Sequence, residues 1–93
     1  MGVTVVVPAA LAAYSGGLRE VAVEGGPMTV AGVFDRLAAE APALERRIRD
    51  ERGAVRRHVN VYVDGQDIRG LDGVATVVRE GGEIAVMAAI SGG

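Results

Sequence analysis

Four stretches of the chain predict β-strands from the arrangement of their apolar residues. Strand side chains alternate between two faces, so apolar residues at every second position mark a strand with one buried face. The predicted strands are the β-branched Val3–Val7 and the alternating Leu18–Glu24, His58–Val63 and Glu83–Ala88. A short return strand is predicted at Gln66–Ile68, because the preceding Asp64-Gly65 is a strong hairpin-turn signal.

One main helix is predicted between the second and third strands. Apolar residues recur there at three- and four-residue spacing, which is typical of a helix with a single apolar stripe. The stripe consists of Val30, Val33, Phe34, Leu37, Ala38 and Ala41. Thr29 stands at the N-cap position, and Pro42 is predicted to end the helix.

The remaining segments predict connections. Ala9–Ala13 is an apolar link of about one helical turn, and Tyr14–Gly17 is a turn by composition. Leu44–Arg52 predicts a short helix or turn that is mostly solvated, with an anionic-ligand site on its basic cluster as the alternative. The crossing Arg69–Arg79 is predicted to be irregular, with a short helical turn near Val74–Val78.

This order of elements predicts an α+β fold with the ubiquitin-like β-grasp layout. A hairpin, a helix and three returning strands give a mixed sheet of four to five strands packed on one main helix. Because the helix has one apolar stripe, it can cover only one face of the sheet. The expected organisation is a β-grasp domain over residues 1–88 and a flexible Gly-Gly tail over residues 89–93.

Charge and composition narrow the functional classes. A net charge of −2 and only three aromatic residues leave no basic, aromatic-rich surface for nucleic acid. All ten cationic side chains are arginine, which reflects either GC-rich codon usage or a benefit from having no lysine amine near an activated carboxyl group. No stretch reaches the roughly 18 apolar residues of a membrane span, so we expect a cytoplasmic protein with no membrane partner.

Few residues in the body of the chain could perform catalysis. The absence of cysteine excludes disulfides, thiolate catalysis and Cys-ligated metals. His58 is the single histidine, and its position at the start of a strand favours packing or exposure over a catalytic role. The carboxylates Asp64, Asp67 and Asp72 have no calcium-loop spacing, and the glycine pairs do not fit a phosphate loop. A stand-alone enzyme is therefore not expected.

The terminal carboxyl group of Gly93 is the remaining candidate for chemistry. Neither Gly92 nor Gly93 has a Cβ, so such a tail can thread a narrow slot and leave its carboxyl carbon open to attack. A partner using ATP could form an acyl-adenylate there, and a sulfur nucleophile could displace AMP to leave a thiocarboxylate. The five residues 89–93 can extend roughly 16–18 Å into a partner. The alternative is that two final glycines occur by chance in a glycine-rich chain.

The chain resembles the MoaD/ThiS family of ubiquitin-like sulfur carriers over essentially its whole length. The resemblance rests on VNVYVDGQDIRGLDGVATVVREGGEI (Val59–Ile84) and on the ending AAISGG. Within the family it is greatest to the actinobacterial carriers that serve cysteine synthesis. One departure is Ala88 and Ala89, where many members have prolines, and this casts doubt on docking to a molybdopterin-type large subunit.

The resemblance implies a role for each tail residue. Gly93 would be adenylated and thiocarboxylated, Gly92 and Ser91 would thread into the partner, and the partner would contact Met87, Ala89 and Ile90. Ordinary packing is the alternative for Met87 and Ile90.

The resemblance also implies partners and the absence of a bound cofactor. The expected partners are an E1-like adenylyltransferase/sulfurtransferase that uses ATP, a sulfur-accepting synthase, and a JAMM-type metalloprotease that frees the tail. The chain itself would be a protein co-substrate that binds no cofactor. The acceptor pathway stays open among cysteine, thiosugar, thiazole and molybdopterin synthesis. Two other functions also stay open, namely a ubiquitin-like covalent modifier joined to lysines of other proteins, and a passive β-grasp interaction module.

Overall fold

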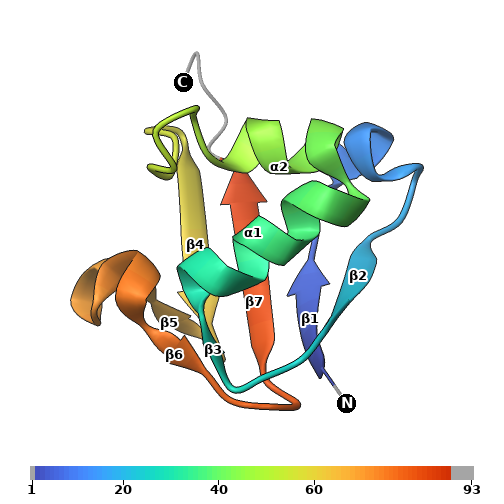
Figure 1. Cartoon of the computed structure of the whole chain (residues 1–93). Coiled ribbons are helices and arrows are strands. Elements are labelled where there is room, and N and C mark those ends of the chain that lie inside the picture. Colours follow the sequence, from blue (N-terminus) through green and yellow to red (C-terminus); the bar gives the residue numbers. More distant parts are fainter. Residues whose placement is uncertain (1, 89–93) are drawn as a thin grey trace.

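Five strands form one mixed sheet in the computed structural model, which describes residues 2–88 (Figure 1). The spatial order is β2-β1-β7-β4-β5. The bounds are β1 (Gly2–Val6), β2 (Glu20–Glu24), β4 (Val59–Val63), β5 (Gln66–Asp67) and β7 (Glu83–Ala88). β1 pairs antiparallel with β2 and parallel with β7, while β4 pairs antiparallel with β7 and β5. The predicted mixed sheet is therefore confirmed, with the last strand at its centre.

Two helices lie over the same face of this sheet (Figure 1). They are α1 (Val30–Glu40) and α2 (Pro42–Ile48). The connections contain three 3₁₀ helices: η1 (Ala9–Ser15), η2 (Ile68–Gly70) and η3 (Gly73–Ala75). The other face of the sheet carries half-buried and exposed side chains, so it is the face open to partners.

Helix α1 forms as its sequence pattern predicts. Thr29 is the N-cap, and its Oγ1 accepts a hydrogen bond of 3.0 Å from the backbone N–H of Gly32. The buried stripe consists of Val30, Val33, Phe34 and Leu37. Pro42 follows the end of α1 as predicted, but it is also the first residue of α2, a position where its missing N–H costs nothing.

Replacement of Thr29 by alanine is expected to destabilise the fold by about 1 kcal/mol, because the N–H of Gly32 loses its cap. The free energy of unfolding can be measured by urea titration. Thr29→Ser keeps the hydroxyl and serves as the control. An equal loss for the two variants would contradict the role of the hydroxyl as a cap.

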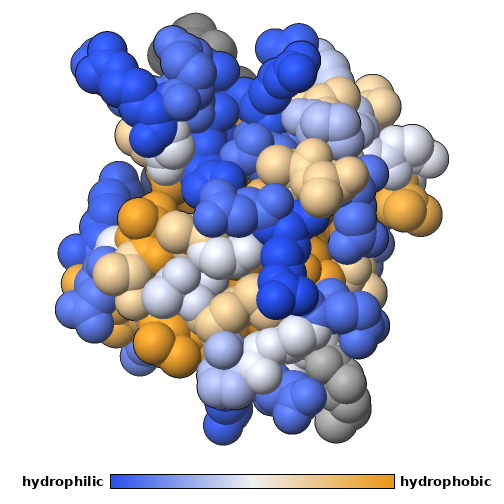
Figure 2. All heavy atoms as spheres, viewed as in Figure 1, coloured by the Kyte–Doolittle hydropathy of each residue, from blue (hydrophilic) through white to orange (hydrophobic). Residues whose placement is uncertain are grey.

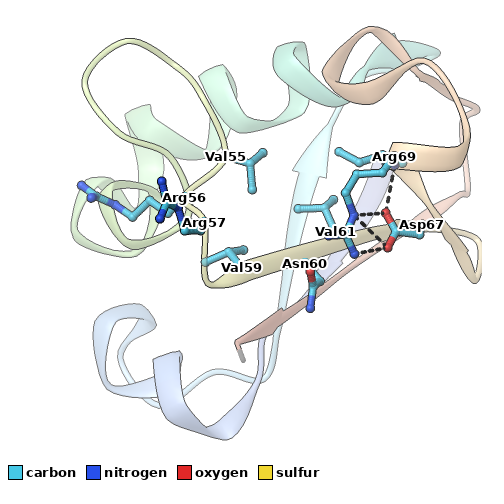
Figure 3. Close-up of a pocket in the computed structure, with 9 residues that line it drawn as sticks. Val55, Arg56, Arg57, Val59, Asn60, Val61, Asp67 and Arg69 are labelled. Carbon is cyan, nitrogen blue, oxygen red and sulfur yellow. Dashed lines mark hydrogen bonds and ion pairs between the residues drawn. The ribbon is translucent and has the colours of Figure 1, made fainter. Parts of the chain in front are cut away.

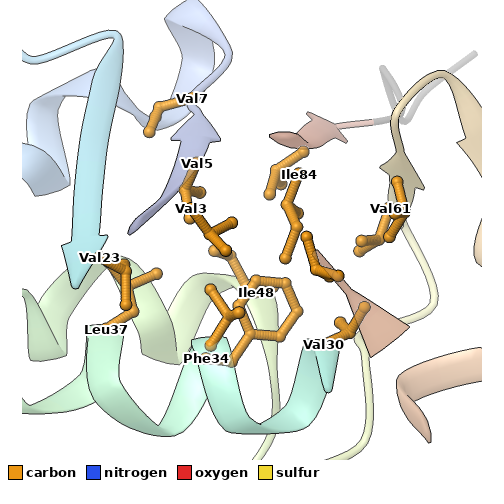
Figure 4. Close-up of a cluster of buried hydrophobic side chains, with 14 of the residues drawn as sticks. Val3, Val5, Val7, Val23, Val30, Phe34, Leu37, Ile48, Val61 and Ile84 are labelled. Carbon is orange, nitrogen blue, oxygen red and sulfur yellow. The ribbon is translucent and has the colours of Figure 1, made fainter. Parts of the chain in front are cut away.

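The core lies between the sheet and the two helices (Figure 4). The inward-facing residues of each strand alternate with outward-facing ones, and the strands contribute mainly valine. The fully buried side chains of largest volume are Phe34, Leu37, Leu44, Ile48 and Ile84. Phe34 is the only aromatic residue among these buried hydrophobic side chains, which are otherwise valine, leucine and isoleucine.

The short helix predicted in Leu44–Arg52 is confirmed as α2, but one side of it is buried rather than solvated. Leu44 and Ile48 of α2 are fully buried, and Arg49 is only 8% exposed. The guanidinium of Arg49 forms ion pairs with Asp35 at 2.8 Å and Glu45 at 2.5 Å. Two apolar positions four residues apart were enough to bury this helix because α1 and η1 both pack against it.

Three shorter predictions also need correction. The link after β1 is the seven-residue helix η1 rather than one turn, and β2 begins at Glu20, so Leu18 stays exposed. The helical turn expected near Val74–Val78 lies at η3, because Val77–Val78 instead forms strand β6. β6 pairs with β3 (Met28–Thr29) in a separate two-stranded sheet that the sequence pattern did not predict.

Candidate functional site

The central strand β7 positions the end of the chain. It lies between β1 and β4, and its last described residue, Ala88, is paired with Val59 at the start of β4. Ala88 therefore lies in the middle of the sheet, at the end toward which the parallel strands β1 and β7 both run (Figure 1). The predicted sulfur-bearing and threading residues Gly93, Gly92 and Ser91, and the predicted contacts Ile90 and Ala89, lie outside the described residues.

Met87 is the one predicted partner-contact residue that the structure describes. Its side chain is 52% exposed on the open face of the sheet, opposite Asn60 of β4. Packing in the interior therefore does not account for an apolar residue at this position. An exposed methionine is flexible and polarizable, which suits it to contacts with differently shaped surfaces.

A low-charge strip lies beside Met87 on the same open face. Val6, Ala85 and Tyr62 are cross-strand neighbours on β1, β7 and β4, and each is half-buried. Residues at paired positions on one face of a sheet lie within contact distance of one another. The strip offers a small, mainly apolar area at the base of the tail.

Arginines flank the end of β7, and the sequence analysis assigned no role to two of them, Arg19 and Arg57. Arg57 lies two residues before Val59 and is exposed, whereas Arg19 lies on the opposite flank, with its Nε donating to the Val7 carbonyl at 2.7 Å. The signal was present in the sequence as a run of basic residues between 46 and 57. Because acidic residues lie among these basic ones, a solvated surface without a binding role was the simpler interpretation of the run.

The turn carboxylates have structural roles. Asp64 Oδ1 accepts a hydrogen bond of 2.9 Å from the N–H of Glu83, which fixes the start of β7. The guanidinium and backbone N–H of Arg69 hold the pKa of Asp67 below its ordinary value. The backbone N–H groups of Ala54 and Arg52 lower the pKa of Asp50 in the same way. These contacts organise loops, and they favour the ionised form of the Asp50 and Asp67 carboxyl groups.

A hollow of about 280 Å³ opens beside Val59–Val61, the part of β4 that does not pair with β5 (Figure 3). Its apolar floor includes Val59, Val61 and Ile68, and Arg57 and the Asp67–Arg69 ion pair lie on its rim. It contains no serine, cysteine or histidine that could act as a nucleophile or base. Within residues 2–88, no three His, Asp or Glu side chains gather in a way that could hold a metal ion. His58 is exposed.

Comparison with known families identifies the chain. The ThiS family model matches residues 5–93, which is nearly the whole sequence. The chain belongs to the ThiS family. The resemblance predicted from Val59–Ile84 and the final residues is therefore confirmed.

The similar proteins agree with this family. The sulfur carrier protein CysO of Mycobacterium tuberculosis is 33% identical over 95 residues, which cover all of both chains. A chain of the Amycolatopsis orientalis BexX/CysO complex superimposes with a TM-score of 0.86 at 30% identity, covering 98% of this ThiS-family chain and 99% of that chain. The SAMP1 protein of Haloferax volcanii superimposes with a TM-score of 0.83 at 29% identity and full coverage of both chains. These likenesses confirm the ubiquitin-like β-grasp fold.

The part of this ThiS-family chain that the structure describes contains no helix with the length and apolar character needed to cross a membrane.

Proposed function

We propose that this ThiS-family chain is a sulfur carrier whose reactive group is the carboxyl of Gly93. The observation that carries the proposal is the full-length likeness to a sulfur carrier protein, together with a family match that runs through Gly93. The chain is then a protein co-substrate for other enzymes rather than an enzyme itself.

The chemistry proceeds in two steps that a partner catalyses. The Gly93 carboxylate attacks the α-phosphorus of ATP, which releases pyrophosphate and leaves an acyl-adenylate. Hydrosulfide then attacks the carbonyl carbon, so that a C–S bond forms, the C–O bond to AMP breaks, and one proton leaves. The product is a thiocarboxylate, whose sulfur is a better nucleophile than the oxygen of the original carboxylate. No cofactor resident on the carrier is needed, because the partner binds the ATP.

The partners are those that must reach the tail. We assign loading to an E1-like adenylyltransferase/sulfurtransferase, sulfur acceptance to a biosynthetic synthase, and release of a conjugated tail to a JAMM-type metalloprotease. The neighbour structure in which CysO is found in a complex with BexX supports a carrier that works through a second protein. Gly92 and Ser91 would thread into the partner while Met87, Ala89 and Ile90 contact its surface.

A covalent protein modifier is the second candidate function. The likeness to the small archaeal modifier protein SAMP1 favours it, because that protein has the same fold over its full length. This chain contains no lysine, so its own side chains offer no amine on which a second copy could be joined. If it does modify proteins, each modified lysine of a target would carry a single copy. The mass of the target would then rise by the mass of one copy for each modified lysine.

Loading of the tail can be tested directly. The purified chain, incubated with the E1-like enzyme from the same genome, ATP and sulfide, is expected to gain about 16 Da by intact mass spectrometry as one oxygen becomes sulfur. Omission of ATP is the control and should leave the mass unchanged. A chain that gains no mass with any E1-like enzyme of that genome would contradict the carrier function and favour a passive interaction module.

A further inference from the structure

The charges of this chain are unevenly distributed. Residues 45–58 contain six arginines and three carboxylates, for a net charge of +3, whereas the whole chain has a net charge of −2. The rest of the molecule is therefore clearly acidic. In the folded protein, α2 and the loop that joins it to β4 lie at the end of the sheet where β7 stops (Figure 1). Hydrophilic side chains gather at this end in the space-filling view (Figure 2).

Five of these six arginines form no close ion pair with a described residue, although Asp50 attracts Arg52 and Arg56 electrostatically. Arg49 is ion-paired with Asp35 and Glu45. Within residues 2–88, no carboxylate lies within 4.0 Å of the guanidinium groups of the other five. We call these five the basic surface: Arg46, Arg47, Arg52, Arg56 and Arg57.

Uncharged groups hold two members of the basic surface in place. The guanidinium of Arg47 lies 4.4 Å from the ring centroid of Tyr14, and Nε of Arg56 donates to the carbonyl of Arg46 at 2.8 Å. Contacts of this kind order an arginine but leave its full positive charge available. Arg46, Arg47 and Arg56, with Tyr14, line a hollow of about 300 Å³. A planar guanidinium binds a carboxylate with two parallel hydrogen bonds, so this hollow suits an aspartate or glutamate side chain.

We propose that the basic surface docks an acidic face of the enzyme that loads the tail. This inference rests on the proposed carrier function. Arg57 lies two residues before Val59, and Val59 is paired with Ala88, so a protein that receives the tail passes close to this surface. Loading brings two anions together, the Gly93 carboxylate and ATP. Attraction between remote groups of the two proteins offsets that repulsion and raises the rate of encounter.

An acidic protein face fits the basic surface better than nucleic acid does. Asp50 and Glu51 lie among the arginines, and the rest of the chain is acidic, so a long phosphate backbone meets repulsion on every side. The chain also has few aromatic residues on which bases could stack. A protein face with a few aspartates or glutamates can match the arginines and avoid the carboxylates.

The test is the double variant Arg46→Glu plus Arg57→Glu, since both side chains are exposed and neither makes a described side-chain contact. Its KM for loading by the E1-like enzyme, with ATP and sulfide, is expected to rise roughly 10-fold or more at low salt, with kcat changed less than about twofold. The rise should largely vanish at 1 M salt, where the screening length falls to about 3 Å. Circular dichroism confirms that the variant is folded.

The control is Arg36→Glu plus Arg79→Glu, which changes the net charge equally on exposed residues outside the basic surface. Because Arg36 donates to the Glu24 carbonyl and Arg79 lies 3.9 Å from Asp64, circular dichroism checks the fold of this variant as well. The control should raise KM less than about twofold. Equal effects of the two pairs, or no effect of the first pair, would overturn the docking role while leaving the carrier function intact. Binding of a fluorescent single-stranded oligonucleotide at 0.15 M salt, lost in the first pair only, would also overturn it. A wild-type chain that is never loaded would instead overturn the proposed function, and the docking inference with it.

Discussion

Deletion of Gly93 is expected to abolish loading of the chain with sulfur. The deletion moves the terminal carboxyl back by about 3.3–3.6 Å along an extended tail. A displacement of only 1 Å at a reacting centre can lower a rate by about 10²-fold, so the shortened tail should fall below detection. The measurement is the mass increase of about 16 Da in the presence of the E1-like enzyme, ATP and sulfide.

Two variants give this prediction its controls. Ser91→Ala keeps the length and the terminal carboxyl, so it should still be loaded. Gly93→Ala also keeps the length but adds a Cβ beside the reacting carbon, so it should be loaded more slowly than wild type. If the chain without Gly93 were loaded as well as wild type, Gly93 would not be the sulfur-bearing residue.

Replacement of Phe34 by alanine is expected to lower the free energy of unfolding by about 3–5 kcal/mol. The ring is fully buried in the core between the sheet and the helices, so its removal both loses apolar burial and leaves a cavity. Small domains have total stabilities of about 5–15 kcal/mol, so this loss is a large share of the total and should clearly lower the urea concentration at the midpoint of unfolding. Urea titration followed by circular dichroism measures the loss.

Leu18→Ala is the matched control for the core substitution. Leu18 is also a large apolar residue, but it is 57% exposed, so its truncation should change the free energy of unfolding by less than about 0.5 kcal/mol. A loss for Phe34→Ala no larger than that for Leu18→Ala would show that the core does not depend on this ring.

The sequence predicts the parts of the fold that have a repeated local pattern. Five consecutive β-strand residues or a three-turn apolar stripe constrain the structure on their own, which is why β1, β4, β7 and α1 lie where expected. The ladder between β3 and β6 has two residues on each side, too few to show alternation. Helix α2 was predicted as solvated because its charged residues outnumber Leu44 and Ile48, and its burial depends on distant elements.

The candidate site divides in a similar way. Gly92 and Gly93 could be proposed from chemistry, because two residues without a Cβ after the last strand are an unusual local feature, whereas the roles of the residues before them came from the family resemblance. The arginines of the basic surface could not, because their role depends on which of them find a carboxylate in the folded chain. Among the six arginines of residues 45–58, Arg49 alone forms an ion pair within the described residues, and its partner Asp35 lies on a different helix. Ion pairs between separate elements leave no periodic trace in a sequence.

The central position of β7 has a mechanical consequence. β7 is hydrogen-bonded to β4 along one side and to β1 along the other, through five and three paired positions respectively. A force applied to the tail acts along β7, parallel to the neighbouring strands. It therefore loads the hydrogen bonds to β1 and β4 in shear, and these bonds resist it together instead of breaking one after another. If an enzyme draws the tail into a deep channel, the force that it applies should therefore not readily unfold the domain.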